Sequence, residues 1–116
     1  MSVLGLTDAC LSKTSIDLLR VTLALGAASL TDLDLSFSFT GYSGAVLIRD
    51  ALKSPDCQLI RLGLAGNTFA DKGVETMLPG LLVNKTLTYL DLRSNFITGK
   101  VINSLFSSYL HMKFAF

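Results

Sequence analysis

The sequence predicts an α/β fold in which about four similar units, each a short strand followed by a helix, stack side by side. The segment LTYLDLRSNFITG, Leu87 to Gly99, spaces its leucines as neither a plain strand nor a plain helix does. Matching segments recur along the chain at intervals of 29, 29 and 28 residues. In the middle units, apolar residues at helical spacing follow the matching segment, which indicates that a unit ends in an amphipathic helix.

The repeated motif places apolar residues at relative positions 1, 4, 6 and 11 and an asparagine at position 9. The last two units match it fully, with Leu59, Leu62, Leu64, Asn67 and Phe69 and with Leu87, Leu90, Leu92, Asn95 and Ile97. The first unit matches with Met1, Leu4, Leu6 and Leu11 and the second with Leu30, Leu33 and Leu35, but Ala9 and Ser38 replace the asparagine. We therefore expect an incomplete row of asparagines in the turns of the first half of the chain.

Four units account for the whole chain, with boundaries at about 1–29, 30–58, 59–86 and 87–116. No residues remain for a linker, so the sequence predicts a single domain of stacked repeats. Neither end carries a polar covering unit, which solenoids need to stay soluble. Two interpretations stay open: the chain is a fragment or short isoform of a longer repeat protein, or it stacks on another copy of itself.

Side-chain alternation assigns a place to each motif position. Leucines at positions 4 and 6 of a short strand point to one side, into the core. The asparagine at position 9 lies in the turn after the strand, where its amide can satisfy backbone groups of neighbouring turns. Stacked units then form a parallel sheet on one side and a row of helices on the other.

The helix ends carry weaker signals. Asp71 is the expected N-cap of the helix in the third unit, because a carboxylate there can accept backbone N–H bonds. Pro79 is expected to kink or end that helix near Leu78. The last unit runs into HMKFAF without completing a recognisable helix.

These features together resemble the ribonuclease-inhibitor-like class of leucine-rich repeats. The stretch SPDCQLIRLGLAGN, Ser54 to Asn67, is similar to repeats of ribonuclease inhibitor and of the NACHT-containing innate-immune receptors. The resemblance implies a curved, right-handed βα solenoid with a short parallel sheet on the concave face and helices on the convex face. It also implies that Cys57 is a buried structural residue and that the concave face binds a protein partner.

Composition narrows the function classes. The net charge is +1 and no basic stripe is present, which argues against nucleic-acid binding. The apolar stretch Ser15 to Leu30 contains Asp17 and Arg20 and is too short for a membrane span, so no membrane association is expected. Cys10 and Cys57 are expected to be reduced thiols in a reducing compartment, which indicates a cytoplasmic protein.

Catalytic chemistry is not expected. The single histidine, His111, lies near the C-terminus without a nucleophile pattern beside it, and two cysteines with one histidine are too few for a metal centre. Asp32 and Asp34 share one strand face, but acid–base catalysis would require a cleft that shifts a pKa. We therefore predict no enzyme activity, no metal and no cofactor.

The residues between the inward leucines should point outward to form the candidate binding face. Equivalent positions of a parallel stack are neighbours, so Asp32 is expected beside Arg61, and Arg61 beside Tyr89. Arginine and tyrosine are common at the centres of protein interfaces. The predicted partner-binding residues are Asp32, Asp34, Ser36, Arg61, Tyr89, Asp91 and Arg93.

The leading hypothesis is a non-catalytic protein–protein interaction module whose concave face binds a protein partner. One alternative is a regulator of a small GTPase, because Ran GTPase-activating protein is built from similar repeats. Another is a structural segment that self-associates through its uncapped ends. Phe37 and Phe39 are interpreted mainly as packing residues, with Phe37 as the one that an interface would use.

Overall fold

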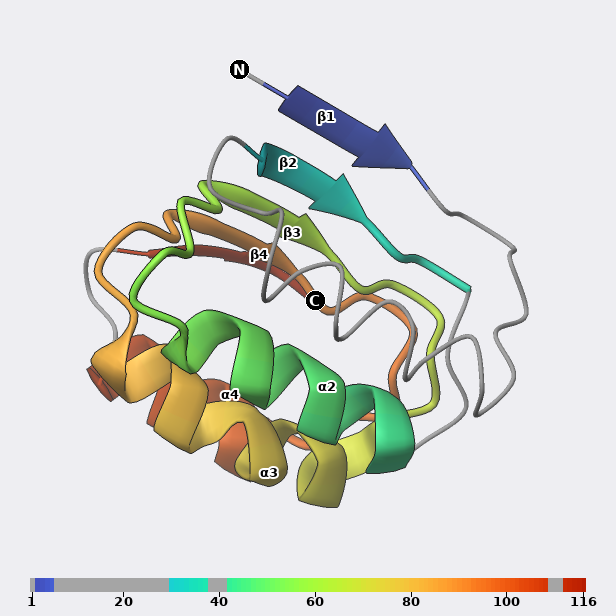
Figure 1. The fold of residues 1–116 in the computed structure, drawn as a ribbon. Helices are drawn as coiled ribbons and strands as arrows, with labels where there is room; N and C mark the ends of the chain where they lie inside the picture. Colours follow the sequence, from blue (N-terminus) through green and yellow to red (C-terminus); the bar gives the residue numbers. More distant parts are fainter. Residues whose placement is uncertain (1, 6–29, 38–41, 109–111) are drawn as a thin grey trace.

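A parallel sheet forms one layer of the molecule, and helices form the layer beneath it (Figure 1). The computed structural model describes residues 2–5, 30–37, 42–108 and 112–116. Its five strands are β1 (Ser2–Gly5), β2 (Leu30–Asp34), β3 (Arg61–Gly63), β4 (Tyr89–Asp91) and β5 (Lys113–Ala115). They lie in the order β1-β2-β3-β4-β5, so strands adjacent in sequence are adjacent in space. The predicted α/β repeat architecture is confirmed.

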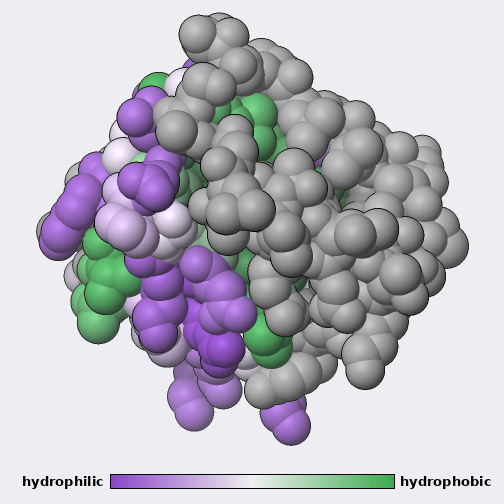
Figure 2. Space-filling model, in the orientation of Figure 1, coloured by the Kyte–Doolittle hydropathy of each residue, from purple (hydrophilic) through white to green (hydrophobic). Residues whose placement is uncertain are grey.

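From β2 onward, a helix lies between each strand and the next, on one side of the sheet. These helices are α2 (Tyr42–Lys53), α3 (Ala70–Val83) and α4 (Gly99–Ser108). Figure 1 shows the three helices side by side beneath the sheet, so that all helices of the described residues lie on one side of it. Figure 2, in the same orientation, shows hydrophilic side chains along the lower side of the molecule, where the helices lie, with hydrophobic patches between them.

The strand register aligns the leucines of successive units. Leu33 pairs with Leu62, Leu62 with Leu90, and Leu90 with Phe114. The three leucines are at most 2% exposed, as are Leu35, Leu64 and Leu92, which follow two residues later. Alternation along each strand thus directs positions 4 and 6 into the core, as the sequence predicts.

The helices complete the core with their apolar faces. Buried side chains recur along them at intervals of three or four residues, which is the spacing of one helical face. They are Ala45, Ile48 and Leu52 of α2, Val74, Met77 and Leu81 of α3, and Val101 and Leu105 of α4. Helices α2 and α3 approach so closely that a Cβ built on Gly80 would lie 2.7 Å from the Arg49 carbonyl oxygen.

Two buried asparagines link the turns that follow strands β2, β3 and β4. The Asn67 side-chain amide donates to the carbonyls of Leu35 (3.1 Å) and Leu64 (2.9 Å). Asn95 repeats this one unit later with Leu64 (2.8 Å) and Leu92 (3.1 Å), and its Oδ1 accepts the Asn67 N–H at 2.8 Å. Each asparagine therefore satisfies backbone groups in its own turn and in the preceding one. The predicted roles of these residues are confirmed, whereas Ser38 and Ala9 lie outside the described residues.

A second asparagine link joins the ends of the helices, and the sequence pattern did not predict it. Asn84, directly after α3, donates to the Leu52 carbonyl at 3.2 Å and contacts the Cys57 sulfur at 3.6 Å. Its Oδ1 accepts the Leu87 N–H at 2.8 Å. The Cys57 thiol is free and only half-buried, against the expectation of a fully buried residue. Cys10 and His111 lie outside the described residues.

In the helix of the third unit, Asp71 is not the predicted N-cap, and of the two outcomes expected at Pro79, a kink or an end, the structure contradicts the end. Asp71 does not cap α3, which begins at Ala70 after Phe69 and has no side-chain cap. The Asp71 carboxylate instead accepts the backbone N–H (2.8 Å) and the hydroxyl (2.6 Å) of Thr98, directly before α4. Pro79 does not end the helix either, because α3 continues to Val83 and buries Gly80 and Leu81.

The last part of the chain is more regular than the sequence indicates. Helix α4 forms before the HMKFAF segment, with Val101 and Leu105 buried one turn apart. Strand β5 then adds to the sheet beside β4, so that the sheet contains one strand more than the four predicted units supply.

Candidate functional site: the exposed face of the sheet

The side of the sheet away from the helices is built from the residues between the inward leucines. At the level of the first outward position, the register aligns Asp32 with Arg61, Arg61 with Tyr89, and Tyr89 with Lys113. The predicted neighbours are therefore confirmed, and Lys113 extends the row. One step along the strands, Asp34, Gly63, Asp91 and Ala115 form the next row.

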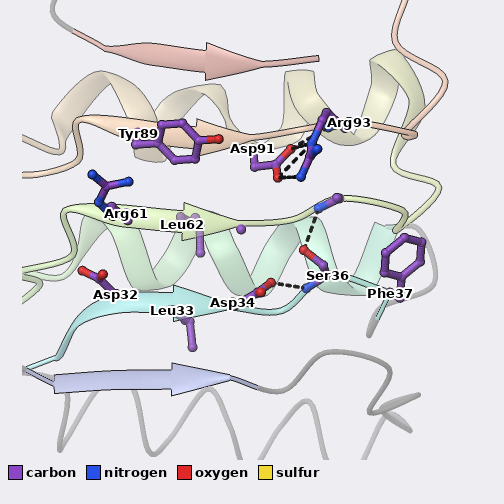
Figure 3. Close-up of a pocket in the computed structure, with 12 residues that line it drawn as sticks. Asp32, Leu33, Asp34, Ser36, Phe37, Arg61, Leu62, Tyr89, Asp91 and Arg93 are labelled. Atoms are coloured by element: carbon purple, nitrogen blue, oxygen red, sulfur yellow. Dashed lines mark hydrogen bonds and ion pairs between the residues drawn. The ribbon is translucent and has the colours of Figure 1, made fainter.

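Arg61 and Tyr89 form a stacked pair at the centre of the first row. The Arg61 guanidinium carbon lies 5.5 Å from the centre of the Tyr89 ring, within the range of a cation–π contact. Arg61 is exposed, and Tyr89 is half-buried. Figure 3 shows Arg61 on β3 and Tyr89 on the adjacent strand β4, on the same face of the sheet. The contact orders an arginine on this face without using an acidic partner.

Asp91 and Arg93 form an ion pair at the end of β4. The Asp91 carboxylate accepts from the Arg93 backbone N–H (3.1 Å), from Nε (3.0 Å) and from Nη2 (2.8 Å). Burial of Asp91 raises its pKa, but the hydrogen bonds and positive charge of Arg93 outweigh this and hold the pKa below its ordinary value of 3.8. The same contacts raise the pKa of Arg93. The pair fixes Arg93 in place while its side chain remains 62% exposed.

Asp34 and Ser36 order the neighbouring end of β2. The Asp34 carboxylate accepts the Ser36 N–H at 3.0 Å, and the Ser36 hydroxyl accepts the Ala65 N–H at 3.1 Å. Asp34 also leans over Gly63, where an added Cβ would lie 2.7 Å from its Oδ1. Ser36 and Asp91 are each only 7% exposed, so both position their neighbours more than they present a surface to a partner.

A groove of about 430 Å³ opens along this face. All seven residues predicted for partner binding line it, together with Leu33, Phe37, Leu62, Gly63 and Ala65. The groove is deep over Gly63, at the end of β3, and over Ala65 just after it, because both residues are small. Figure 3 shows Phe37 at one end of the groove and the Arg61–Tyr89 pair toward the other.

Phe37 is a groove residue that the sequence assigned mainly to packing. It is 53% exposed and has a positive φ of 58°. Its ring lies against Gly66, whose own φ is 67° and whose missing side chain leaves room for it. A bulky residue in this backbone region is uncommon and strained, which makes an exposed aromatic here a candidate contact for a partner. Phe39 lies outside the described residues.

Comparison with known proteins agrees with the repeat architecture. A family model for the leucine-rich repeat matches residues 83–100, which include strand β4 and Asn95. The human NACHT, LRR and PYD domains-containing protein 3 is 31% identical over 108 residues, which are 93% of this chain and 10% of that protein. The human protein 14 of the same series is 33% identical over 107 residues, 92% of this chain and 9% of that protein. The chain is a leucine-rich repeat protein.

The leucine-rich repeats of this chain resemble the repeat regions of NACHT-containing receptors. The bovine NACHT, LRR and PYD domains-containing protein 9 is 35% identical over 68 residues, 59% of this chain and 7% of that protein. The chain thus spans a tenth or less of the length of these relatives.

The groove of this leucine-rich repeat protein is lined by charged and aromatic side chains. Within residues 2–5, 30–37, 42–108 and 112–116, no three of histidine, cysteine, aspartate and glutamate gather as metal ligands. The described helices also include none with the length and apolar content to cross a membrane. The groove instead combines fixed charges, one stacked arginine and an exposed phenylalanine.

Proposed function

We propose that the chain is a non-catalytic protein-interaction module of ribonuclease-inhibitor-like leucine-rich repeats, and that it binds a protein partner through the exposed face of its sheet. The observation that carries this proposal is the groove lined by Asp32, Arg61, Tyr89, Arg93 and Phe37. Arginine and aromatic side chains contribute most of the binding energy at many protein interfaces. Here their positions are set by contacts within the chain, which lowers the entropy lost on binding.

Rigidity of the face supports a role in binding a preformed partner surface. Beyond the strands, backbone bonds continue between turns, from Leu35 N to Gly63 O (2.8 Å) and from Leu64 N to Asp91 O (2.9 Å). Asn67 and Asn95 hold the same turns from beneath. A face fixed in this way changes little on binding, as in many preorganised complexes.

The proposal includes the finer architecture that the resemblance implies. The four segments 1–29, 30–58, 59–86 and 87–116 are repeats of one domain, and the stack is a curved, right-handed solenoid with the groove on its concave face. Helices are wider than strands, so a stack with helices on one side bends toward the sheet. The cytoplasm is the proposed location. The relatives are named for NACHT and PYD domains beside the repeats, which favours a partner-binding role for the repeats within a larger protein.

Site-specific photocrosslinking in cells tests the proposed interface. A photoreactive phenylalanine analogue replaces Tyr89 or Asp34 on the groove, or Glu75 or Lys100 on the exposed sides of α3 and α4. The proposal predicts one discrete protein adduct from both groove positions and none from the helix positions. Adducts from the helix positions alone, or equally from all four, would contradict it.

Self-association is a second candidate because an aromatic cluster lies beside the outer strand β5. The ring centres of Phe106 and Phe114 are 5.8 Å apart, and those of Phe106 and Phe116 are 5.5 Å apart. Phe106 is 50% exposed and Phe116 is 37% exposed. An uncovered strand edge with apolar side chains favours pairing with another strand. Light scattering across a concentration series decides: a constant monomer mass eliminates this candidate, and a dimer that Phe106→Lys dissociates supports it.

A further inference from the structure

We infer that the partner presents an acidic side chain, aspartate or glutamate, to the row formed by Arg61, Tyr89 and Lys113. The inference rests on the proposed function, because it specifies the chemistry of a partner on the same face. The three residues come from strands β3, β4 and β5, and the strand register makes them successive neighbours. With adjacent strands about 4.8 Å apart, Arg61 and Lys113 lie about 10 Å apart across Tyr89.

Side-chain direction places all three residues of the row on the exposed face. Leu62 and Leu90 are buried, and Phe114 packs against the core, so the residue before each of them points to the opposite side. Arg61 and Lys113 are both exposed. The row is therefore a half-buried tyrosine flanked by two accessible cations.

Charge on the face is divided across the strands. Strand β2 contributes two carboxylates, Asp32 and Asp34, whereas β3 and β5 contribute the cations Arg61 and Lys113. On β4, Asp91 and the following Arg93 neutralise each other through their ion pair. The half of the face over β3 to β5 is consequently positive, and it is complementary to a carboxylate.

The cations of the row differ from Arg93 in how they are held. Among the described residues, ion pairs form between Asp91 and Arg93 and between Asp50 and Arg49, and none includes Arg61 or Lys113. Asp32 is the register neighbour of Arg61, yet the guanidinium lies over Tyr89 rather than on that carboxylate. Stacking on an aromatic ring leaves the edge of the guanidinium available, and that edge matches a carboxylate with two parallel hydrogen bonds.

A basic side chain of the partner, placed over Asp32 and Asp34, is the alternative, and the contacts of these two residues favour it less. The Asp34 carboxylate already accepts the Ser36 N–H at 3.0 Å, which uses part of its hydrogen-bonding capacity. Asp32 has the positive charge of Arg61 beside it in the register, which weakens its attraction for a second cation. We therefore place the anionic contact at Arg61 and Lys113.

Three labelled peptides test this inference with the full chain. The probes are fluorescein-labelled peptides of about eight residues, with glutamate, lysine or serine at alternate positions and glycine between them. Binding is measured by fluorescence polarisation at low salt, because exposed charge pairs weaken as salt screens them. The contact is located from amide shifts in two-dimensional nuclear magnetic resonance spectra. The glutamate peptide is expected to bind and to shift amides of β3, β4 and β5.

Matched variants distinguish the effect of the cations in the row from the effect of net charge on peptide binding. Arg61→Gln and Lys113→Gln each remove one positive charge from the face, and Lys72→Gln and Lys100→Gln remove one from exposed positions on α3 and α4. Arg61→Gln and Lys113→Gln should each weaken binding of the glutamate peptide about tenfold, which is the effect of losing one charged hydrogen bond. Lys72→Gln and Lys100→Gln should each weaken it less than about twofold. Asp32→Asn should strengthen binding about two- to fivefold by removing a competing carboxylate. Circular dichroism confirms that each variant is folded.

Each remaining outcome overturns the inference. Equal binding to all four lysine and arginine variants, or no saturable binding of the glutamate peptide, removes the acidic contact. A lysine or serine peptide that binds more tightly and shifts the same strands also removes it, but leaves the proposed function intact. The proposed function fails separately, if the photocrosslinked adducts form from the helix side.

Discussion

At the scale of single residues, buried amides hold the turns of this molecule together. Asn67 and Asn95 were predictable from sequence, because an amide at a fixed place in each repeat can donate and accept between successive turns. Asp71 and Asn84 were not predictable, because neither stands at a polar position of the repeated motif that would assign it a partner in the next unit. Local rules for helix ends assign Asp71 to its own helix, and only the stacking of units reveals that it binds Thr98.

Replacing Asn67 by alanine should destabilise the fold by about 2–3 kcal/mol. The change removes the Asn67 amide from the Leu35 carbonyl and one of two amide donors from the Leu64 carbonyl, which Asn95 still reaches, in a site where Asn67 is fully buried. Asn103→Ala, at an exposed position of α4, is the matched control and should alter stability by less than about 0.5 kcal/mol. Urea unfolding followed by circular dichroism measures both. Equal effects of the two variants would mean that the asparagine link is not a source of stability.

The Asp91–Arg93 pair should make stability depend on acidic pH. The folded-state pKa of Asp91 lies below its ordinary value of 3.8, so folding favours the ionised form. Its contribution is complete above about pH 4 and is lost as pH falls through the depressed folded-state pKa. The difference in unfolding free energy between pH 7 and pH 3 should therefore be smaller in Asp91→Asn than in the unmodified chain.

A double-mutant cycle attributes that pH dependence to the pair. Arg93→Gln should reduce the same difference, and the double variant should reduce it no further than Asp91→Asn alone. Additive reductions would show that the two side chains act independently, against the contacts between them.

At the scale of elements, the strands were predictable and the ends of the helices were not. The buried leucines of β2, β3 and β4 follow a two-residue alternation that the sequence displays directly. Helix α3 continues past Pro79 because Val74, Met77 and Leu81 bury a continuous face, and this packing outweighs the local cost of the proline. Strand β5 was missed because HMKFAF lacks the leucine spacing, yet Phe114 still pairs with Leu90.

Gly80→Ala tests how closely helices α2 and α3 pack. The added Cβ would lie 2.7 Å from the Arg49 carbonyl oxygen, a backbone atom that cannot move without shifting the helix. We expect a loss of about 1–3 kcal/mol in unfolding free energy. Gly99→Ala is the control, because nothing lies within 4 Å of a Cβ there, and it should change stability by less than about 0.5 kcal/mol. A neutral Gly80→Ala would show that the two helices are farther apart than described.

At the scale of the whole molecule, stacking of the units places equivalent residues of successive repeats side by side on one face of the sheet. Residues 28 or 29 positions apart become neighbours on one face, and this brings Asp32, Arg61 and Tyr89 together. All seven predicted partner residues line one groove for the same reason. Sequence alone did not show that Ser36 and Asp91 are buried, or that Phe37 lies at one end of the groove. Turn geometry and side-chain contacts determine these features.

The parallel register is the claim on which the groove, the proposed interface and the acidic contact all depend. It is tested most directly by disulfide formation between paired cysteines, in a chain with Cys10→Ser and Cys57→Ser. Residues 61 and 89 are register partners on adjacent strands, whose spacing of about 4.8 Å permits a disulfide, whereas residues 61 and 91 are offset by two positions and lie beyond its reach. Under mild oxidation, Arg61→Cys with Tyr89→Cys should form the intramolecular disulfide readily, and Arg61→Cys with Asp91→Cys should not. Ready closure of the second pair and failure of the first would contradict the account.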